Sequence, residues 1–588
     1  MIRTLLKSLR EYGKSAVLTM LVMTGEVLME TLIPYTMAQL IDQGFAEGNL
    51  PFIVKTGLVL VLYALVSMAF GSLGSLLGAR AGTGFAKNLR GDMYHRIQAF
   101  SFANIDRFST SSIITRLTTD VTNVQNAFTM SIRMAVRTPM TLIFSIVMTT
   151  FISWKFAVVT ALAVPVLITA FVILGRKVFP IFMRVFKKYD RLNADVQENV
   201  RGIRVVKSFV RETYEEDKFR KTSGEIYSDF VTAERIMAWL NPVMMGTSYI
   251  MMLAIAFIGA YLIVGKDATT VSIMGETVTT GLLNSALSYT MQILMSCMGL
   301  SMVVIMIIMS RESMRRICEI LKEEPAIRNP EDPVMEVADG SITFKDVNFR
   351  YSESAERNSL EDVDLEIPSG ATVGIIGSTG SSKTTLVQLI PRLYDVSEGQ
   401  VSVGHVDVRA YDLKTLRDAV SMVLQKNLLF AGTIRENLRW GNEHATDEEI
   451  REACRLAACD EFIANMPDGY DTFIEQGGSN VSGGQRQRLC ITRALLKKPK
   501  VLILDDSTSA VDTATDARIR KSFREVIPET TKLIIAQRIA SVREADMIIV
   551  MDNGRVIDVG DHDALMGRCA VYREVYDSQV KGGDGDAA

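Results

Sequence analysis

The fold of this chain is decided by the stretch Gly377-Ser378-Thr379-Gly380-Ser381-Ser382-Lys383-Thr384-Thr385. An apolar run at 371–376, which predicts a buried strand, precedes it, and residues 386–390 predict the first turns of a helix. A glycine-rich turn between strand and helix that ends in Lys-Thr is the arrangement that holds phosphate groups. Its backbone N–H groups converge on the anion, Lys383 offers a positive charge, and the Thr384 hydroxyl can hold Mg²⁺. We therefore expect a nucleotide site here.

One position in this loop departs from the usual pattern. The residue before the lysine is normally glycine, and here it is Ser382. A Cβ atom there crowds the loop slightly, although serine suits the N-terminus of a helix. We expect the loop still to bind nucleotide.

Length and composition indicate a chain with two unlike halves. At 588 residues it is too long for one domain, and 48% hydrophobic residues stand beside 22% charged ones. The mean hydropathy is +0.19, which suggests an apolar half joined to a soluble half. A net charge of −3 supplies no global basic field, so no nucleic-acid partner is expected. The six cysteines have no metal-like spacing (Cys297, Cys318, Cys454, Cys459, Cys490 and Cys569). We interpret Cys454 and Cys459 as small packing residues on a predicted helix, and the cysteines suggest a reduced, cytosolic setting for the soluble half.

The first half predicts six membrane-spanning helices, because each of six apolar segments is about 20 residues long or longer. They lie near 16–41, 53–79, 128–153, 156–179, 240–264 and 279–309. The N-terminus and the two long links, 80–127 and 176–239, are rich in Lys and Arg, which places both chain ends and these links in the cytoplasm of a cell, which we expect to be bacterial. No cleavable signal pattern begins the chain, so we expect the first segment to stay in the plasma membrane, in contact with lipid.

Polar groups inside these segments have two interpretations. Glu26 and Glu30 share one face of the first helix, and Arg133 and Arg137 stand four residues apart on the third. They could line a cavity for a cationic or amphipathic substrate, or they could pair with one another between helices. A methionine face on the sixth helix likewise suits either a pliable apolar pocket or ordinary packing (Met291, Met295, Met298, Met302, Met306 and Met309).

The two long links contain segments that could contact a partner domain. One runs from Asn104–Phe108 through Thr115–Asp120, and the other covers 201–209 and continues to 217–220. An acidic, proline-rich stretch at 323–333 then marks a linker.

Alternating strand and helix patterns from Ile342 onward indicate an α/β domain. Tyr351, about two dozen residues before the phosphate loop, could stack on adenine. The strand Val501–Asp505 ends in a carboxylate, and Asp505 at the strand tip can hold Mg²⁺ through water. We therefore expect ATP and Mg²⁺ as ligands.

Three further motifs identify a family. Val481-Ser482-Gly483-Gly484-Gln485, Gln425 within 423–426, and Ser509-Ala510-Val511-Asp512 resemble the signature, Q-loop and D-loop of ABC transporters. Preceded by six membrane segments, the chain resembles an ABC exporter half-transporter over nearly all its length. The resemblance implies that the two contact segments are coupling helices, and that 475–478 contacts them. It also implies that Gln425 links bound nucleotide and its Mg²⁺ to the membrane helices.

The resemblance also implies that each ATP is shared between two subunits. Ser482 and the glycines after it offer a hydroxyl, N–H groups and a helix N-terminus to a γ-phosphate held by the other chain, with Asp512 on the same side.

Two positions depart from the family pattern. After the Mg²⁺ aspartate, members that hydrolyse ATP carry glutamate, and here Asp506 is one methylene shorter; a misplacement of about 1 Å can cost on the order of 10²-fold in rate. Where the family has a histidine that contacts the γ-phosphate, this chain has Gln537, which cannot carry a positive charge. The site on this chain's own loop is therefore predicted to be degenerate.

The expected architecture is a six-helix transmembrane domain of ABC exporter type (1–322), a linker (323–340), an α/β nucleotide-binding domain (341–577) and a disordered tail (578–588). We expect an ATP-driven exporter of small hydrophobic or amphipathic compounds, of multidrug type, that works as a heterodimer with a second half-transporter carrying the missing glutamate and histidine. Lipid or peptide export, and an ATP-gated channel or sensor subunit, are the alternatives.

Overall fold

The computed structural model describes residues 1–264, 278–352, 355–506 and 511–583. The chain forms two compact units: Met1–Gln98 with Thr110–Glu323, and Ala99–Ser109 with the chain from Glu324 onward. Each unit is described by itself.

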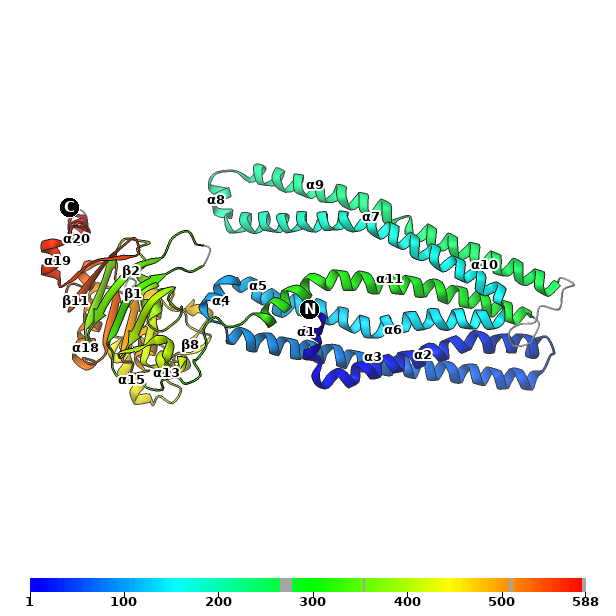
Figure 1. Ribbon diagram of the computed structural model, residues 1–588, viewed down its shortest axis with the longest axis horizontal. Helices are drawn as coiled ribbons and strands as arrows, with labels where there is room; N and C mark the ends of the chain where they lie inside the picture. Colours follow the sequence, from blue (N-terminus) through cyan, green and yellow to red (C-terminus); the bar gives the residue numbers. More distant parts are fainter. Residues whose placement is uncertain (265–277, 353–354, 507–510, 584–588) are drawn as a thin grey trace. The chain divides into compact units, whose positions relative to one another are not determined.

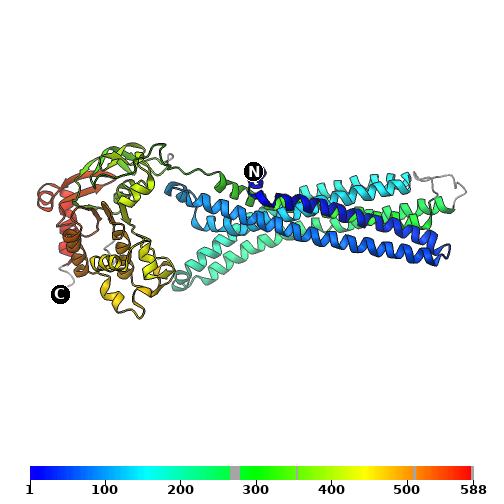
Figure 2. The same cartoon turned by 90° about the horizontal axis from the view of Figure 1, so that it is seen from below.

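The first unit is helical throughout. Its helices are α1 (Ile2–Leu6), α2 (Gly13–Gln39), α3 (Leu50–Gln98), α5 (Thr110–Thr115), α6 (Val121–Ile152), α7 (Trp154–Arg201), α8 (Ile203–Ser208), α9 (Glu212–Met237), α10 (Leu240–Val264) and α11 (Thr280–Lys322). Six of the resulting helical stretches are apolar and long enough to cross a membrane, which confirms the prediction of six spans. The shortest has 43 residues and is about 65 Å long, roughly twice the hydrocarbon thickness of a bilayer. Figures 1 and 2 show these helices side by side, with α8 at the turn between α7 and α9.

Glycines let α3 approach α2 closely. A Cβ atom on Gly74 would lie 2.2 Å from the Met23 side chain, and one on Gly71 would lie 3.0 Å from Glu26 Oε1. Small residues are the usual means by which membrane helices pack closely. Here they leave room for a charged side chain between the two helices.

Both arginines of the third membrane segment make polar contacts with other helices of this chain, and one of them pairs with the two glutamates. Arg137 on α6 donates to Glu30 Oε1 over 2.8 Å and lies 3.4 Å from Glu26 Oε1. Arg133, one turn earlier, donates to Ser75 Oγ on α3 over 3.0 Å. Of the two interpretations, the structure favours pairing for Arg137.

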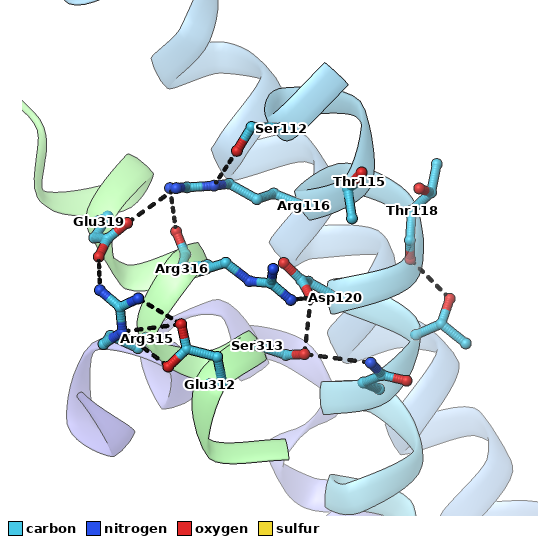
Figure 3. Close-up of polar contacts among 12 residues, drawn as sticks. Ser112, Thr115, Arg116, Thr118, Asp120, Glu312, Ser313, Arg315, Arg316 and Glu319 are labelled. Carbon is cyan, nitrogen blue, oxygen red and sulfur yellow. Dashed lines mark hydrogen bonds and ion pairs between the residues drawn. The ribbon is translucent and has the colours of Figure 1, made fainter. Parts of the chain in front are cut away.

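A second polar cluster joins the cytoplasmic ends predicted for α6 and α11 (Figure 3). Asp120, which is completely buried, accepts from Ser313 Oγ over 2.8 Å and from the Arg316 guanidinium over 2.6 Å. Arg116, four residues before Asp120, donates to the Arg316 carbonyl over 2.8 Å and pairs with Glu319 over 3.0 Å. Arg116–Asp120 is a π-helical turn, η3, between α5 and α6. The wider turn brings both of its charged ends against α11.

The second unit contains three sheets, of which the six-stranded one carries the phosphate loop. Its order is β12-β11-β3-β10-β9-β6, and every neighbouring pair is parallel except β11 with β12. The strands are β3 (Thr372–Gly377), β6 (Val420–Val423), β9 (Val501–Asp505), β10 (Thr531–Ile535), β11 (Met547–Asp552) and β12 (Arg555–Gly560). This confirms the predicted α/β domain.

The remaining strands form two antiparallel sheets. The first, β2-β1-β4-β5, contains β1 (Ile342–Phe349), β2 (Leu360–Ile367), β4 (Glu398–Val403) and β5 (Val406–Asp407); β7 (Gly432–Thr433) pairs with β8 (Phe473–Ile474). The helices of this unit are α4 (Phe102–Arg107), α12 (Lys383–Leu389), α13 (Leu413–Ala419), α14 (Ile434–Arg439), α15 (Asp447–Leu456), α16 (Asp460–Ala464), α17 (Gly483–Leu495), α18 (Thr513–Val526), α19 (His562–Arg568) and α20 (Ala570–Gly583). Two apolar cores hold the unit together, one beneath α17 and the other between β3 and the antiparallel sheet.

Two parts of the chain differ from the predicted boundaries. Residues 578–583, predicted as part of a disordered tail, belong to α20, because Tyr572 on the same helix is fully buried in the core of the unit. The rest of that prediction, 584–588, lies outside the described residues. The segment Ala99–Ser109, predicted within the membrane domain, belongs to the second unit, where Tyr394 donates to Asp106 Oδ2 over 2.5 Å.

Candidate nucleotide site

Four neighbouring parallel strands end at the same edge of the six-stranded sheet, and each carries a predicted site residue at its end or two residues beyond it. Gly377 ends β3, Asp505 ends β9, Gln537 follows β10 by two residues, and Gln425 follows β6 by two. In register, Ile535 lies opposite both Ile375 and Asp505. Ligands of open α/β sheets bind beyond the carboxyl ends of the strands. The strand order therefore gathers residues that lie up to 160 positions apart in the sequence.

The phosphate loop follows β3 and closes tightly on the sheet. A Cβ atom on Gly377 would lie 2.2 Å from the Met551 carbonyl oxygen, so glycine is required there, and Gly380 has a φ of +87°. Ser382 has φ 69° and ψ 26°, in the left-handed region, and makes no side-chain cap to α12. The expected benefit of serine at a helix N-terminus is therefore wrong, because the backbone keeps the conformation that suits glycine.

Lys383 folds back onto the loop. Its Nζ donates to the carbonyl oxygens of Gly377 and Ser378, each over 2.8 Å, and to Ser381 Oγ over 3.2 Å. Burial lowers the pKa of the Lys383 ammonium, against the nearby Asp506 and Asp505 carboxylates, which favour the charge. The ammonium thus lies inside the loop whose N–H groups are expected to face phosphate.

Thr384 and Asp505 form an oxygen pair suited to Mg²⁺. The Thr384 hydroxyl donates to Asp505 Oδ1 over 3.0 Å, and Asp505 is 1% exposed. Burial raises the pKa of the Asp505 carboxyl, while the hydrogen bond from Thr384 opposes that shift. A hydroxyl and a buried carboxylate are hard oxygen donors, and Mg²⁺ in such sites takes its other ligands from water and phosphate. The residues present therefore fit MgATP, in which the cation supplies charge neutralisation between the phosphates.

The two departures from the family pattern are in direct contact. Gln537 Nε2 donates to Asp506 Oδ2 over 2.8 Å, and the Gln425 side chain also hydrogen-bonds to Asp506. Burial raises the pKa of the Asp506 carboxyl, and the two amides oppose that shift. Gln487 on α17 donates to the Asp506 carbonyl over 3.3 Å. The Asp506 carboxylate is thus held by amides on both neighbouring strand ends.

Tyr351 lies beside the phosphate-loop helix. Its hydroxyl is 3.0 Å from Thr385 Oγ1 and 3.3 Å from Gln388 Oε1, both on α12, and 48% of the residue is exposed. Its ring meets Tyr394 edge-on, with the centroids 5.1 Å apart. This position next to α12, with an exposed ring, is compatible with the predicted stacking on adenine.

The predicted signature begins α17 and lies apart from the phosphate loop. Ser482 caps α17: its Oγ accepts from the Gln485 N–H over 3.2 Å, and Gln485 Oε1 accepts from the Ser482 N–H over 2.9 Å. Asp512 caps α18 through the Thr515 N–H, which lowers the pKa of its carboxyl. One cavity of about 510 Å³ is lined by residues of both helix starts: Ser482, Gly483, Gly484, Arg488, Val511 and Asp512. Val481 is buried beneath it, and Ser509 and Ala510 lie outside the described residues.

Most predicted residues therefore fall into two groups. The first surrounds the phosphate loop and contains Tyr351, Gly377–Thr385, Gln425, Asp505, Asp506 and Gln537, and the second is the signature cavity. Sequence reasoning missed Gln579 on α20, whose side chain brackets the Gln537 backbone, and Asp552 at the end of β11, whose Oδ1 accepts from Ser378 Oγ over 3.3 Å. Neither residue lies in a recognisable motif.

Comparison with known proteins identifies the family. Residues 17–274 match the ABC transporter transmembrane region, and residues 360–509 match the ABC transporter family. The chain is 33% identical over 574 residues to the uncharacterized ABC transporter ATP-binding protein YfiB of Bacillus subtilis (strain 168), covering 98% of each chain. The chain belongs to the ABC transporter family.

Further similarities place this ABC transporter among exporters by fold. It superposes on the structure of a bacterial Atm1-family ABC exporter with ATP bound with a TM-score of 0.82 and 24% identity, over 97% of this chain and 99% of that one. It is also 28% identical over 580 residues to the ATP-dependent lipid A-core flippase of Syntrophus aciditrophicus (strain SB), covering 98% of this chain and 94% of that protein. This ABC transporter thus has the fold of an ABC exporter, with an ATP-binding ABC domain that follows six candidate membrane spans.

Proposed function

We propose that this ABC transporter subunit exports hydrophobic or amphipathic compounds as one half of a heterodimer, and that the ATP site on its own phosphate loop is degenerate. The observation that carries the proposal is the contact between Asp506 and Gln537. Both positions depart from the residues that hydrolysing members carry, and each satisfies the other.

The contact supports slow hydrolysis for a geometric reason. A general base must lie within hydrogen-bond reach of the water that it polarises. The Asp506 side chain is one methylene shorter than glutamate, and its Oδ2 already accepts from Gln537. The binding parts, Lys383 and the Thr384–Asp505 pair, are in place. We infer that the loop binds MgATP and turns it over slowly.

The signature supports an active companion site. Ser482, the following glycines and Asp512 line a single cavity at two helix N-termini, where backbone N–H groups favour an anion. This cavity supports the proposal that the chain contributes its half of a shared site. A partner that contributes its own phosphate loop, glutamate and histidine would therefore form one active site with this chain.

The methionine face supports a pliable apolar cargo. Five of its six members are at least 39% exposed on α11 in this chain: Met291, Met295, Met298, Met302 and Met309. Thioether side chains adapt to ligands of different shape. Lipid export is the second candidate, favoured by the similarity to the lipid A-core flippase.

The decisive experiment compares ATP hydrolysis by this chain alone with hydrolysis by the chain assembled with a second half-transporter encoded beside it. We expect weak activity alone and brisk, Mg²⁺-dependent activity together. ATP-dependent uptake of a fluorescent lipophilic cation into inside-out vesicles, against uptake of a fluorescent phospholipid, separates the two cargo classes. Vigorous hydrolysis by the single chain would overturn the degenerate site.

A further inference from the structure

Helix α20 reaches the segment that carries Gln537. Gln579, in the last turns of α20, uses both ends of its side-chain amide: Nε2 donates to the Gln537 carbonyl over 2.7 Å, and Oε1 accepts from the Ile539 N–H over 2.9 Å. These two bonds bracket Arg538 and fix the backbone on either side of it.

The helix that supplies Gln579 is firmly anchored. Tyr572 is fully buried in the core, with its hydroxyl 2.9 Å from His562 Nδ1, and Val575 and Tyr576 pack against the same core. Gln579 follows Tyr572 by seven residues and Tyr576 by three, so all three lie on one face of α20. The amide is therefore presented by a rigid element.

The bracketed segment leads directly to the candidate site. The Gln537 side chain bonds to Asp506 Oδ2, while the Gln537 carbonyl is held by Gln579. Fixing the backbone restricts where the Gln537 amide can go, because a side chain with three rotatable bonds follows its Cα atom. Positions that face a phosphate must be held to a fraction of an ångström to be effective.

We propose that Gln579 is a positioning residue that holds the Gln537 segment and thereby sets how long ATP stays bound to this chain's phosphate loop. This proposal rests on one part of the proposed function, namely that the phosphate loop retains bound ATP. Both hydrogen bonds of Gln579 go to backbone groups of the Gln537 segment. Gln579 therefore acts through the Gln537 side chain, which the family pattern places at the γ-phosphate. Its effect should therefore depend on that phosphate.

The test uses the full-length chain and a fluorescent MANT nucleotide with Mg²⁺, released by an excess of unlabelled ATP. Losing a pair of hydrogen bonds should speed MANT-ATP release by roughly threefold to tenfold in Gln579→Ala. MANT-ADP release should change less than twofold, because ADP has no γ-phosphate. Ser578→Ala is the matched control: Ser578 is the neighbouring exposed residue on α20, and its hydroxyl donates only within the helix, to the Val575 carbonyl.

A double-mutant cycle separates positioning from general destabilisation. Gln537→Ala keeps the backbone groups that Gln579 holds but removes the side chain through which it acts. In that background Gln579→Ala should have no further effect on MANT-ATP release. Equal acceleration of both nucleotides, or an undiminished effect in the Gln537→Ala background, would overturn the proposal.

The wild-type chain provides the check on the proposed function. If it releases MANT-ATP as fast as MANT-ADP, the retention of ATP is wrong. Amide hydrogen exchange of the nucleotide-free chain then tests whether the two hydrogen bonds of Gln579 form. The Ile539 N–H should exchange faster in Gln579→Ala than in wild type and in Ser578→Ala. Unchanged exchange at Ile539 would refute the bracket.

Discussion

Gln537 donates to Asp506 across 2.8 Å, so the two residues that depart from the family pattern at this nucleotide site are hydrogen-bonded to each other. An amide paired with a carboxylate is a satisfied arrangement at neutral pH. A glutamate with a histidine would place a longer carboxylate and an ionisable ring at the same two strand ends. The two side chains therefore act together, and replacing only one of them should change the ATPase rate less than replacing both.

Restoring the family residues should raise hydrolysis at this chain's own loop. We expect Asp506→Glu with Gln537→His to increase the ATPase rate of the single chain by about 10- to 100-fold, and each single change to give less. Steady-state phosphate release measures the effect, with Lys383→Ala in the restored background as the control that abolishes it. An unchanged rate in the double variant would show that another feature limits hydrolysis.

Replacing the serine of the phosphate loop by glycine should relieve backbone strain. Ser382 has a φ of 69°, a conformation that costs an L-residue about 1 kcal/mol or more and glycine almost nothing. We expect Ser382→Gly to raise the thermal unfolding temperature of the nucleotide-binding unit and to tighten MgATP binding. Ser381→Gly is the contrasting change: Ser381 is 1% exposed and accepts from Lys383, so its loss should weaken binding.

Neutralising Asp505, the buried carboxylate predicted to hold Mg²⁺, should stabilise the nucleotide-free protein in a pH-dependent way. Burial raises the pKa of Asp505 above its ordinary 3.8, so its contribution to stability is full below that pH and is lost as the pH rises through the folded pKa. Asp505→Asn should therefore raise the unfolding temperature most at neutral pH, with the advantage shrinking toward pH 4. Thermal unfolding of both proteins from pH 4 to 8 without nucleotide measures this difference in unfolding temperature. The Asp505→Asn variant should also lose MgATP binding.

The polar cluster between α6 and α11 should be important for the stability of the membrane unit. Asp120→Ala leaves Ser313 and the Arg316 guanidinium without their shared acceptor, at a cost of about 1–3 kcal/mol. Glu312→Ala removes an exposed ion pair with Arg315 and should cost less than about 1 kcal/mol. Thermal unfolding in detergent compares the two, and equal losses would contradict the ranking.

The sequence predicts those parts of the site in which a short motif allows only one arrangement, such as a strand that ends in a carboxylate. The strand 501–505 was predicted with its observed limits, because a run of four apolar residues that ends in Asp505 has few other solutions. The parallel strand order then follows from topology that no local pattern contains, and it is this order that brings Gln425 and Gln537 to the same carboxylate.

The predictions from the sequence that were wrong or left open also have physical explanations. Residues 578–583 contain two polar residues, one lysine and two glycines, a composition that favours disorder, but the burial of Tyr572 further up the helix outweighs it. Ser382 looked like a helix cap, yet the loop backbone holds it in a left-handed conformation before any cap can form. The choice between pairing and cavity lining for Arg137 depended on which helices are neighbours, and α2 with its two glutamates lies within reach.

The π-helical turn at Arg116–Asp120 has a consequence for how this long helix tolerates change in length. In an α-helix, deleting one residue rotates everything beyond it by about 100°, which would carry Arg133 and Arg137 away from their partners on α2 and α3. A π-turn contains one residue more than the α-helical turn that it replaces. A single deletion within those five residues can be absorbed if the turn becomes α-helical, so the downstream arginines keep their orientation about the helix axis. The same deletion inside α6 before these arginines would rotate them away from their partners.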